Sequence, residues 1–216
     1  MSKNDGNSKD ISVQVPDSQF LSLLLKETAA RHTHLCPRQV LGVRMALHGL
    51  QVLNLIRDDY HPRFLNHDKR LLVIVETDGC GADGVAIATN CSVGHRTLRI
   101  LDYGKLAATL VDTHTNQAIR VIPSLAARQL ALQHLPESSD RWHAYVQAYQ
   151  MIPDSELMDL QKVQLTHSIA EILSKANSRA ICSYCGEEVM NEREVSGQNG
   201  VICRNCAGDS YYTLGQ

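Results

Sequence analysis

The chain has 216 residues, of which 44% are apolar, and its formal net charge at neutral pH is −2. This composition supports the core of one or two domains and argues against a largely disordered chain. Nothing in the overall charge balance indicates binding to nucleic acids or acidic membranes. The N-terminal residues lack the apolar core of a secretory signal, so we expect a cytoplasmic protein. In that reducing compartment, seven cysteines are expected to be metal ligands or reactive thiols in preference to disulfides.

The first part of the chain is predicted to contain a leader and two helices. Residues 1–15 are polar and are interpreted as a disordered leader, and no segment approaches the roughly 18 apolar residues of a membrane span. Asp17 is expected to cap a first helix that ends near His32. A second helix is expected over residues 37–56, because Pro37 suits its first position. This helix is apolar on most sides, so it should be buried in a core or against another subunit.

The middle of the chain alternates between strand and helix patterns. Residues 70–78 have the composition of a buried strand, and a helix is expected over residues 81–89. Residues 98–121 contain three strand-like runs separated by turn sequences, and they are predicted to form an antiparallel meander. Helical character returns over residues 124–151, and residues 157–165 alternate like an edge strand. This order predicts an α+β fold in which N-terminal helices pack on an antiparallel or mixed sheet.

The α+β domain is expected to cover residues 16–176, because the composition then changes to small polar residues and cysteines. Two Cys-x2-Cys pairs follow with 17 residues between them, which is the spacing of a structural zinc site. The metal would supply most of the folding energy of a zinc-ribbon or treble-clef-like module over residues 177–216. Its three arginines, absent lysines and five acids disfavour nucleic-acid binding. The four expected Zn²⁺ ligands are Cys182, Cys185, Cys203 and Cys206.

A second set of histidines and cysteines lies at the ends of predicted elements in the first domain. Cys36 precedes Pro37 at the expected N-cap of the second helix, where the helix dipole and unpaired amides stabilise a thiolate. Cys80 opens the next helix and Cys91 lies in the turn after it. Each residue alone could be ordinary packing, but the set favours a thiophilic metal or a reactive thiolate. The candidate core ligands are His32, His34, Cys36, Cys80 and Cys91.

The backbone conformation around His32 decides which histidine can join this site. In an extended segment, His32, His34 and Cys36 share one face and could all reach a single ion. A helical turn at His32 would leave only His34 and Cys36 on that face.

Three ordered motifs carry a resemblance to a known family. The first comprises His32, His34, Leu35, Cys36, Pro37, Leu41, Gly42 and Arg44. The second comprises Asp78, Cys80 and Asp83, and the third comprises Cys91, Gly94, Leu98, Asp102, Gly104 and Lys105, with Arg120 after them. Over about residues 20–165, this pattern resembles the FmdE domain of formylmethanofuran dehydrogenase, a family in which some members also carry a C-terminal zinc finger.

The resemblance implies an α+β core, a homodimer with exchanged or interlocked helices, and a metal bound by the histidine and cysteine motifs. Our leading hypothesis is a metal-binding FmdE-like protein with a redox or one-carbon role, a protein partner in a metabolic operon and a second thiophilic ion, such as Zn²⁺, in the core. The alternative is a metal-sensing or transcription-linked interaction protein that acts through its zinc ribbon. Whether the chain is an enzyme is left open. The candidate catalytic residues are Cys36 and Asp78, and the candidate anion-binding residues are Arg44, Lys105 and Arg120.

Overall fold

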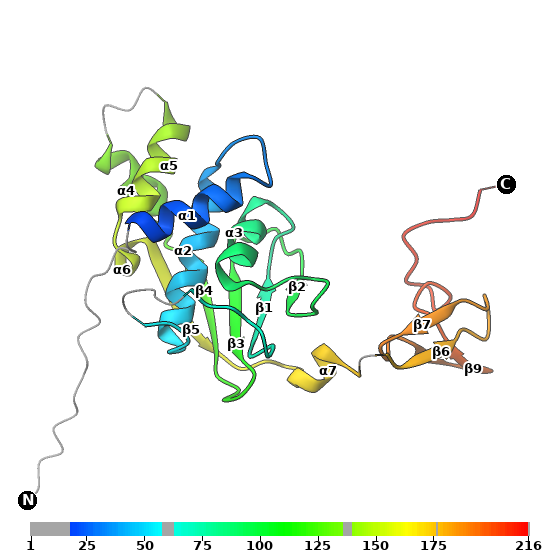
Figure 1. The fold of residues 1–216 in the computed structure, drawn as a ribbon. Helices are drawn as coiled ribbons and strands as arrows, with labels where there is room; N and C mark the ends of the chain where they lie inside the picture. The colour runs from blue at the N-terminus through cyan, green and yellow to red at the C-terminus, as the bar shows by residue number, and fades with distance from the viewer. Residues whose placement is uncertain (1–17, 58–62, 136–139, 176, 216) are drawn as a thin grey trace, which may run out of the picture. The chain divides into compact units, whose positions relative to one another are not determined.

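The computed structural model describes residues 18–57, 63–135, 140–175 and 177–215. The predicted leader and its neighbour Asp17 lie outside the described residues. The chain divides into two compact units, residues 1–164 and residues 165–216 (Figure 1). The second unit therefore includes a short segment before residue 177, where the sequence predicts the zinc module to begin.

The helices of the first unit are α1 (Ser18–Ala29), α2 (Pro37–Val52), α3 (Cys80–Thr89), α4 (Ala127–His134), α5 (Arg141–Met151) and α6 (Asp154–Leu157). The two helices expected near the N-terminus are confirmed, although α2 ends before residue 56. It ends there because Asn54 adopts a left-handed φ of 54° and the Leu53 backbone N–H donates back to the Gly49 carbonyl. The helical stretch expected over residues 124–151 contains two helices, and the Asp140 carboxylate caps the second.

The sheet has five strands in the order β2-β1-β3-β4-β5. Its strands are β1 (Leu71–Val75), β2 (Leu98–Ile100), β3 (Ala108–Asp112), β4 (Ala118–Pro123) and β5 (Met158–Val163). The predicted antiparallel meander is wrong for β2, which pairs in parallel with β1, while β3, β4 and β5 follow antiparallel. The reason is that α3 joins β1 to β2, and a crossover through a helix brings the second strand back in the same direction.

The core of this unit lies between α1, α2 and α3 and one face of the sheet (Figure 1). Val73, Leu110 and Val121 contribute to it from three neighbouring strands and have at most traces of exposed surface. Every residue of α2 from Gln39 to Leu50 is buried, which confirms that this helix is enclosed on all sides. The enclosure is complete within a single chain.

Two glycines, Gly42 and Gly84, allow α2 and α3 to touch backbone to backbone. A Cβ atom on Gly42 would lie 2.2 Å from the Gly81 carbonyl oxygen, and one on Gly84 would lie 2.4 Å from the Gln39 carbonyl oxygen. No other residue type fits at these positions without moving a helix. The contact brings the N-terminal ends of α2 and α3 together.

The second unit is small and has almost no apolar core. Its elements are α7 (Ile169–Leu173), β6 (Arg179–Ile181), β7 (Glu188–Met190), β8 (Val195–Gly197) and β9 (Gly200–Ile202). The strands form two antiparallel hairpins, β6–β7 and β8–β9. Among the residues described in this unit, only the Cys182 side chain is buried. None of the helices in the described ranges is both long and apolar enough to cross a membrane.

Candidate metal centre and cysteine pair

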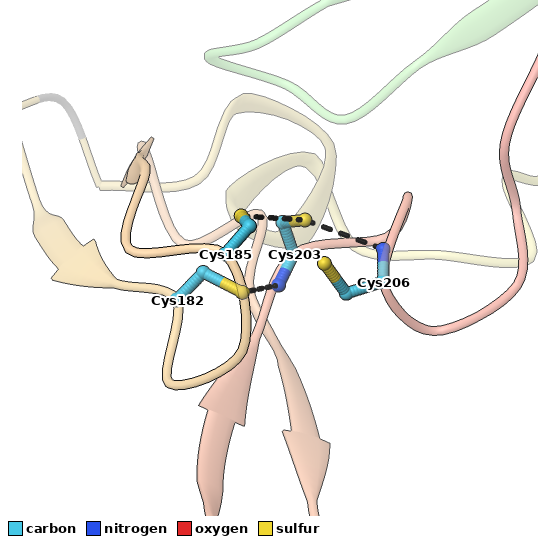
Figure 2. Close-up of side chains that lie close together, drawn as sticks. All are labelled: Cys182, Cys185, Cys203 and Cys206. Carbon is cyan, nitrogen blue, oxygen red and sulfur yellow. Dashed lines mark hydrogen bonds between the residues drawn. The ribbon is translucent and has the colours of Figure 1, made fainter. Parts of the chain in front are cut away.

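The four cysteines of the second unit converge on one point (Figure 2). Their sulfur atoms all lie within 4.8 Å of one another, although the two pairs are far apart in the sequence. Cys182 and Cys185 lie on the turn after β6, and Cys203 and Cys206 lie on the turn after β9. The predicted quartet is therefore brought together as a group that could hold a metal ion.

Local backbone hydrogen bonds shape each half of the quartet. The Gly186 backbone N–H donates to the Cys182 carbonyl at 2.9 Å, and the Ala207 backbone N–H donates to the Cys203 carbonyl at 3.0 Å. Gly186 has a φ of 78°, a conformation that glycine adopts without strain. Across the two halves, the Cys203 backbone N–H donates to Cys182 Sγ at 3.3 Å. These backbone hydrogen bonds orient the sulfurs toward one another.

The electrostatics of the quartet favour a bound cation. Amide N–H groups, foremost those of Cys185 and Cys203, lower the pKa of Cys182 to about 6. Hydrogen bonding to Cys203 and burial raise the pKa of Cys206 to about 12. One thiolate therefore forms easily while another sulfur keeps its proton, because four negative charges repel one another in so small a space. A divalent cation would offset half of the charge of four thiolates and so favour loss of the remaining protons.

In the first unit, Cys36 occupies the predicted position at the start of α2. It is the N-cap, and its Sγ accepts a hydrogen bond from the Gln39 backbone N–H at 3.4 Å. In the opposite direction, the Cys36 backbone N–H donates to the Gln39 side-chain oxygen at 2.8 Å, and the two hydrogen bonds together form a capping box. The side chain of Gln39 is fully buried and was not expected to take part, although a glutamine three residues after an N-cap is a readable capping signal.

The thiol of Cys80 interacts electrostatically with that of Cys36. Cys80 is the first residue of α3 and is half-buried, whereas Cys36 has 7% of its surface exposed. Burial raises the pKa of Cys36, the Gln39 amide opposes this, and the interaction with Cys80 raises it further. The neutral thiol of Cys36 is thus favoured at neutral pH when no partner cation is present.

The two histidines of the first motif have partners of their own. His32 follows a turn in which its backbone N–H donates to the Ala29 carbonyl, and its Nε2 lies 2.7 Å from a carboxylate oxygen of Asp83. The ring of His34 lies 5.4 Å from that of Trp142. The segment is therefore turned at His32, which is the arrangement expected to leave only His34 on the face of Cys36.

Cys91 is placed apart from the cysteine pair. It is 2% exposed, its Sγ accepts from the Asn66 side-chain amide at 3.2 Å, and it donates to the Leu71 carbonyl at 3.7 Å. Burial raises the pKa of this thiol. Within the part of the chain that the structure describes, the C-terminal quartet is the one group of three or more potential ligands. The five candidate core ligands do not meet at one point.

Arg44 lies at the centre of a buried polar network. Its guanidinium donates to Asp154 Oδ1 at 2.6 and 3.0 Å and to the carbonyls of Tyr149 and Ile152, both at 2.7 Å. The other oxygen of Asp154 has no hydrogen-bond partner, and His48 Nδ1 lies 3.7 Å from it. Burial lowers the pKa of His48 despite the attraction of Asp154. This network ties α2 to α5 and α6.

The remaining candidate residues lie around the end of β1. Arg120 binds Glu76 through two hydrogen bonds of 2.5 and 2.7 Å and reaches Gln161 at 2.8 Å. Hydrogen bonding to Arg120 lowers the pKa of Glu76, and the charge of Lys105 acts in the same direction. Asp78 is exposed beside Cys80. The carboxylates of Glu76 and Asp154 were missed from the sequence because each pairs with an arginine remote in the chain.

These features define a class of protein: a mixed α+β domain with a buried cysteine at a helix start, followed by a four-cysteine module consistent with a small zinc domain. The sequence model of the family described as FmdE, molybdenum formylmethanofuran dehydrogenase operon, matches residues 31–159. This range is more than half of the chain, so the chain belongs to the FmdE family. The resemblance inferred from the motifs is confirmed.

Two known proteins are similar over nearly the whole chain. One is a probable S-adenosyl-L-methionine-binding protein of Archaeoglobus fulgidus, with 28% identity over 221 residues that cover 93% of this chain and 57% of the relative. The chain thus spans little more than half of that relative's length. The other is a crystal structure of a tungsten formylmethanofuran dehydrogenase FmdE-like protein from Syntrophus aciditrophicus, with 20% identity, a TM-score of 0.57, and coverage of 93% of this chain and 100% of that one. The second comparison shows a shared fold.

Proposed function

We propose that this chain is a metal-binding FmdE-family protein in which the C-terminal quartet holds a structural zinc ion. The observation that carries the proposal is the convergence of four sulfurs within 4.8 Å from two separate turns. Four thiolates at tetrahedral positions are the ligand set that zinc adopts in structural sites, and they leave no open position for a substrate. The almost coreless second unit needs such an ion to fold.

Elemental analysis tests the zinc assignment. The wild type and a Cys182→Ser, Cys203→Ser double variant are purified without added metal, with Cys91→Ser as the control because Cys91 is a single buried thiol in the other unit. The double variant is expected to lose one zinc per chain and the control none. Equal zinc content in the wild type and the double variant would refute the assignment.

For the first unit, we propose a second site centred on Cys36 and Cys80, with a thiophilic ion such as Zn²⁺ and a redox or one-carbon role. The two neighbouring thiols at helix starts support it. His34 could supply a third ligand if its ring moved away from Trp142. His32 could do so if it gave up its hydrogen bond to Asp83. Cys36→Ser is expected to lower the metal content by one further equivalent, and an unchanged content would reject the core ion.

We also propose an anion-binding site at the end of β1 that consists of Lys105 and Arg120, without Arg44. The guanidinium of Arg44 is enclosed and bound to Asp154, so its role is structural within a single chain. Lys105 is exposed, and an anion beside it would compete with Glu76 for Arg120. Phosphate should raise the thermal unfolding temperature of the wild type, and Lys105→Ala should reduce that increase. Equal protection of the variant would remove the pocket from the proposal.

We also propose a cytoplasmic homodimer that works with a protein partner from a metabolic operon. Because α2 is covered within one chain, the support for a dimer comes from the sheet edge instead. Among the strands of the described residues, β5 pairs with β4 alone, and most residues of β5, including Leu160, are exposed. Exposed edge strands readily pair with a second chain. Light scattering at micromolar concentration should give twice the 23.9 kDa of one chain, and a value near one chain would contradict the dimer.

A further inference from the structure

Two cysteines that are distant in the sequence lie at the starts of α2 and α3, the two helices that touch backbone to backbone, and the Cys80 thiol is close enough to raise the pKa of Cys36. Cys36 is the N-cap of α2 and Cys80 is the first residue of α3. The position of a Cβ on Gly81, next to Cys80, lies 3.6 Å from the Arg38 carbonyl, two residues after Cys36. The glycine contact between the two helices fixes this arrangement. Neither thiol is part of the quartet in the second unit.

We propose that Cys36 and Cys80 form a reversible dithiol–disulfide couple that exchanges with low-molecular-weight disulfides such as oxidised glutathione. The inference deepens the proposed function, since it rests on the same pair of residues as the core site and names its redox chemistry. It does not require that the core binds a metal.

The different exposure of the two thiols assigns their roles. Cys80 is half-exposed and is the first residue of α3, whose N-cap, Gly79, supplies no side-chain hydrogen bond. The positive end of a helix stabilises a thiolate at such a position. Cys36 is buried behind it and accepts one amide hydrogen bond. Cys80 is therefore the thiol that an external disulfide meets first, and Cys36 is the resolving thiol.

The exchange balances in two steps. The Cys80 thiolate attacks one sulfur of the small disulfide, which breaks its S–S bond, forms a mixed disulfide and releases one small thiol that carries the proton of Cys80. Cys36 then attacks the Cys80 sulfur, which forms the internal disulfide and releases the second small thiol with the proton of Cys36. The protein loses two electrons, and the small disulfide gains them.

The other cysteines lack this arrangement. Cys91 is buried between Asn66 and the Leu71 carbonyl, with no second thiol described beside it. The quartet has close sulfurs, such as Cys185 and Cys203 at 3.9 Å, but a bound cation would protect them as ligands. An internal disulfide at Cys36 and Cys80 would also remove both sulfurs as metal ligands, so oxidation and core metal binding exclude each other.

The test is a redox titration of the full chain with its metal in the second unit retained. The protein is equilibrated with reduced and oxidised glutathione at a series of ratios, quenched with acid, alkylated and cleaved after arginine and before aspartate. Cleavage yields residues 32–38 with Cys36, residues 78–82 with Cys80, and a separate fragment with Cys91. We expect a linked 32–38/78–82 species that appears in a two-electron transition and disappears on reduction.

The variants make the result decisive. Cys91→Ser should give the same transition, while Cys80→Ser should abolish it, and Cys36→Ser should stop at the mixed disulfide on Cys80. Absence of the linked species at every ratio in the correctly folded wild type would overturn the inference. The proposed core metal site is tested independently, by the metal content of the reduced protein. Failure of that proposal can therefore be distinguished from failure of the disulfide proposal.

Discussion

Replacing Gly42 with alanine tests whether the helix contact positions the cysteine pair. The new Cβ would lie 2.2 Å from the Gly81 carbonyl oxygen and 3.0 Å from its carbonyl carbon. Ordinary van der Waals contact begins near 3.4 Å, so α2 and α3 must separate by about an ångström. The obstacle is backbone, and no flexible side chain can move aside in its place. The start of α3, and Cys80 with it, would shift away from Cys36.

The size of the effect follows from two opposed contributions. Alanine in a helix interior is favoured over glycine by about 1 kcal/mol. Overpacking in a dense core typically costs about 1–3 kcal/mol, and more where the backbone must move. The backbone clash dominates at Gly42, because both helices are enclosed by other elements. We expect a net loss of roughly 1–2 kcal/mol in the free energy of unfolding.

Urea unfolding followed by tryptophan emission measures this change in the first unit alone. The chain has one tryptophan, Trp142, and it lies in α5. Gly94→Ala is the control, since nothing lies within 4 Å of a Cβ there and its φ is not in the positive region. The control should change stability by less than about 0.5 kcal/mol, as surface substitutions usually do. If Gly42→Ala were as stable as Gly94→Ala and formed the Cys36–Cys80 disulfide equally well, the role assigned to the helix contact would be refuted.

Three further predictions concern the metal and the buried charges. Removing metal with a chelator should unfold the second unit, as followed by circular dichroism, while the emission of Trp142 stays unchanged; a parallel loss of both signals would contradict independent units. Asp154→Ala should cost about 3–5 kcal/mol in urea unfolding, because Arg44 keeps a buried charge without its partner, and a loss below about 1 kcal/mol would show that the network relaxes. Because the pKa of His48 is lowered in the fold, the unfolded chain binds its proton more readily, so stability should fall as pH drops below about 6.5. His48→Gln should flatten that slope between pH 7.5 and 5.5, and an unchanged slope would assign it to other groups.

Local signals explain what could be predicted from the sequence. Pro37 and the cysteine before it mark a helix start, and the structure places Cys36 at that N-cap with Gln39 completing the box. The two Cys-x2-Cys pairs each define a tight turn, and their spacing alone was enough to predict that four sulfurs meet. In each case the interacting residues are close in the chain or belong to a spacing that one geometry satisfies.

Long-range contacts explain what could not be predicted. Arg44 is a candidate anion ligand in the sequence, where nothing near it indicates its hydrogen bond to Asp154, 110 residues later. Cys91 follows a helix in the same way that Cys36 precedes one, but the packing of Asn66 places it among core residues. The pairing of β2 with β1 depends on the path of α3 across the sheet, which strand composition does not encode.

The glycines after β1 show how one motif can serve a different purpose from the one its spacing suggests. Gly79, Gly81 and Gly84 follow a strand and open a helix in the G-x-G-x-x-G pattern typical of dinucleotide-binding turns. In this fold a Cβ on Gly81 would lie 2.3 Å from the Leu106 side chain, and Gly84 lies against the backbone of α2. A phosphate group would therefore have to displace Leu106 before it could approach the turn. Gly84 is required instead for the approach of α2, and Gly81 makes room for Leu106. The approach of α2 brings the helix start that carries Cys80 to the helix start that carries Cys36. A larger residue at Gly84 would therefore push α3 away from α2, and the start of α3 with Cys80 would move away from Cys36.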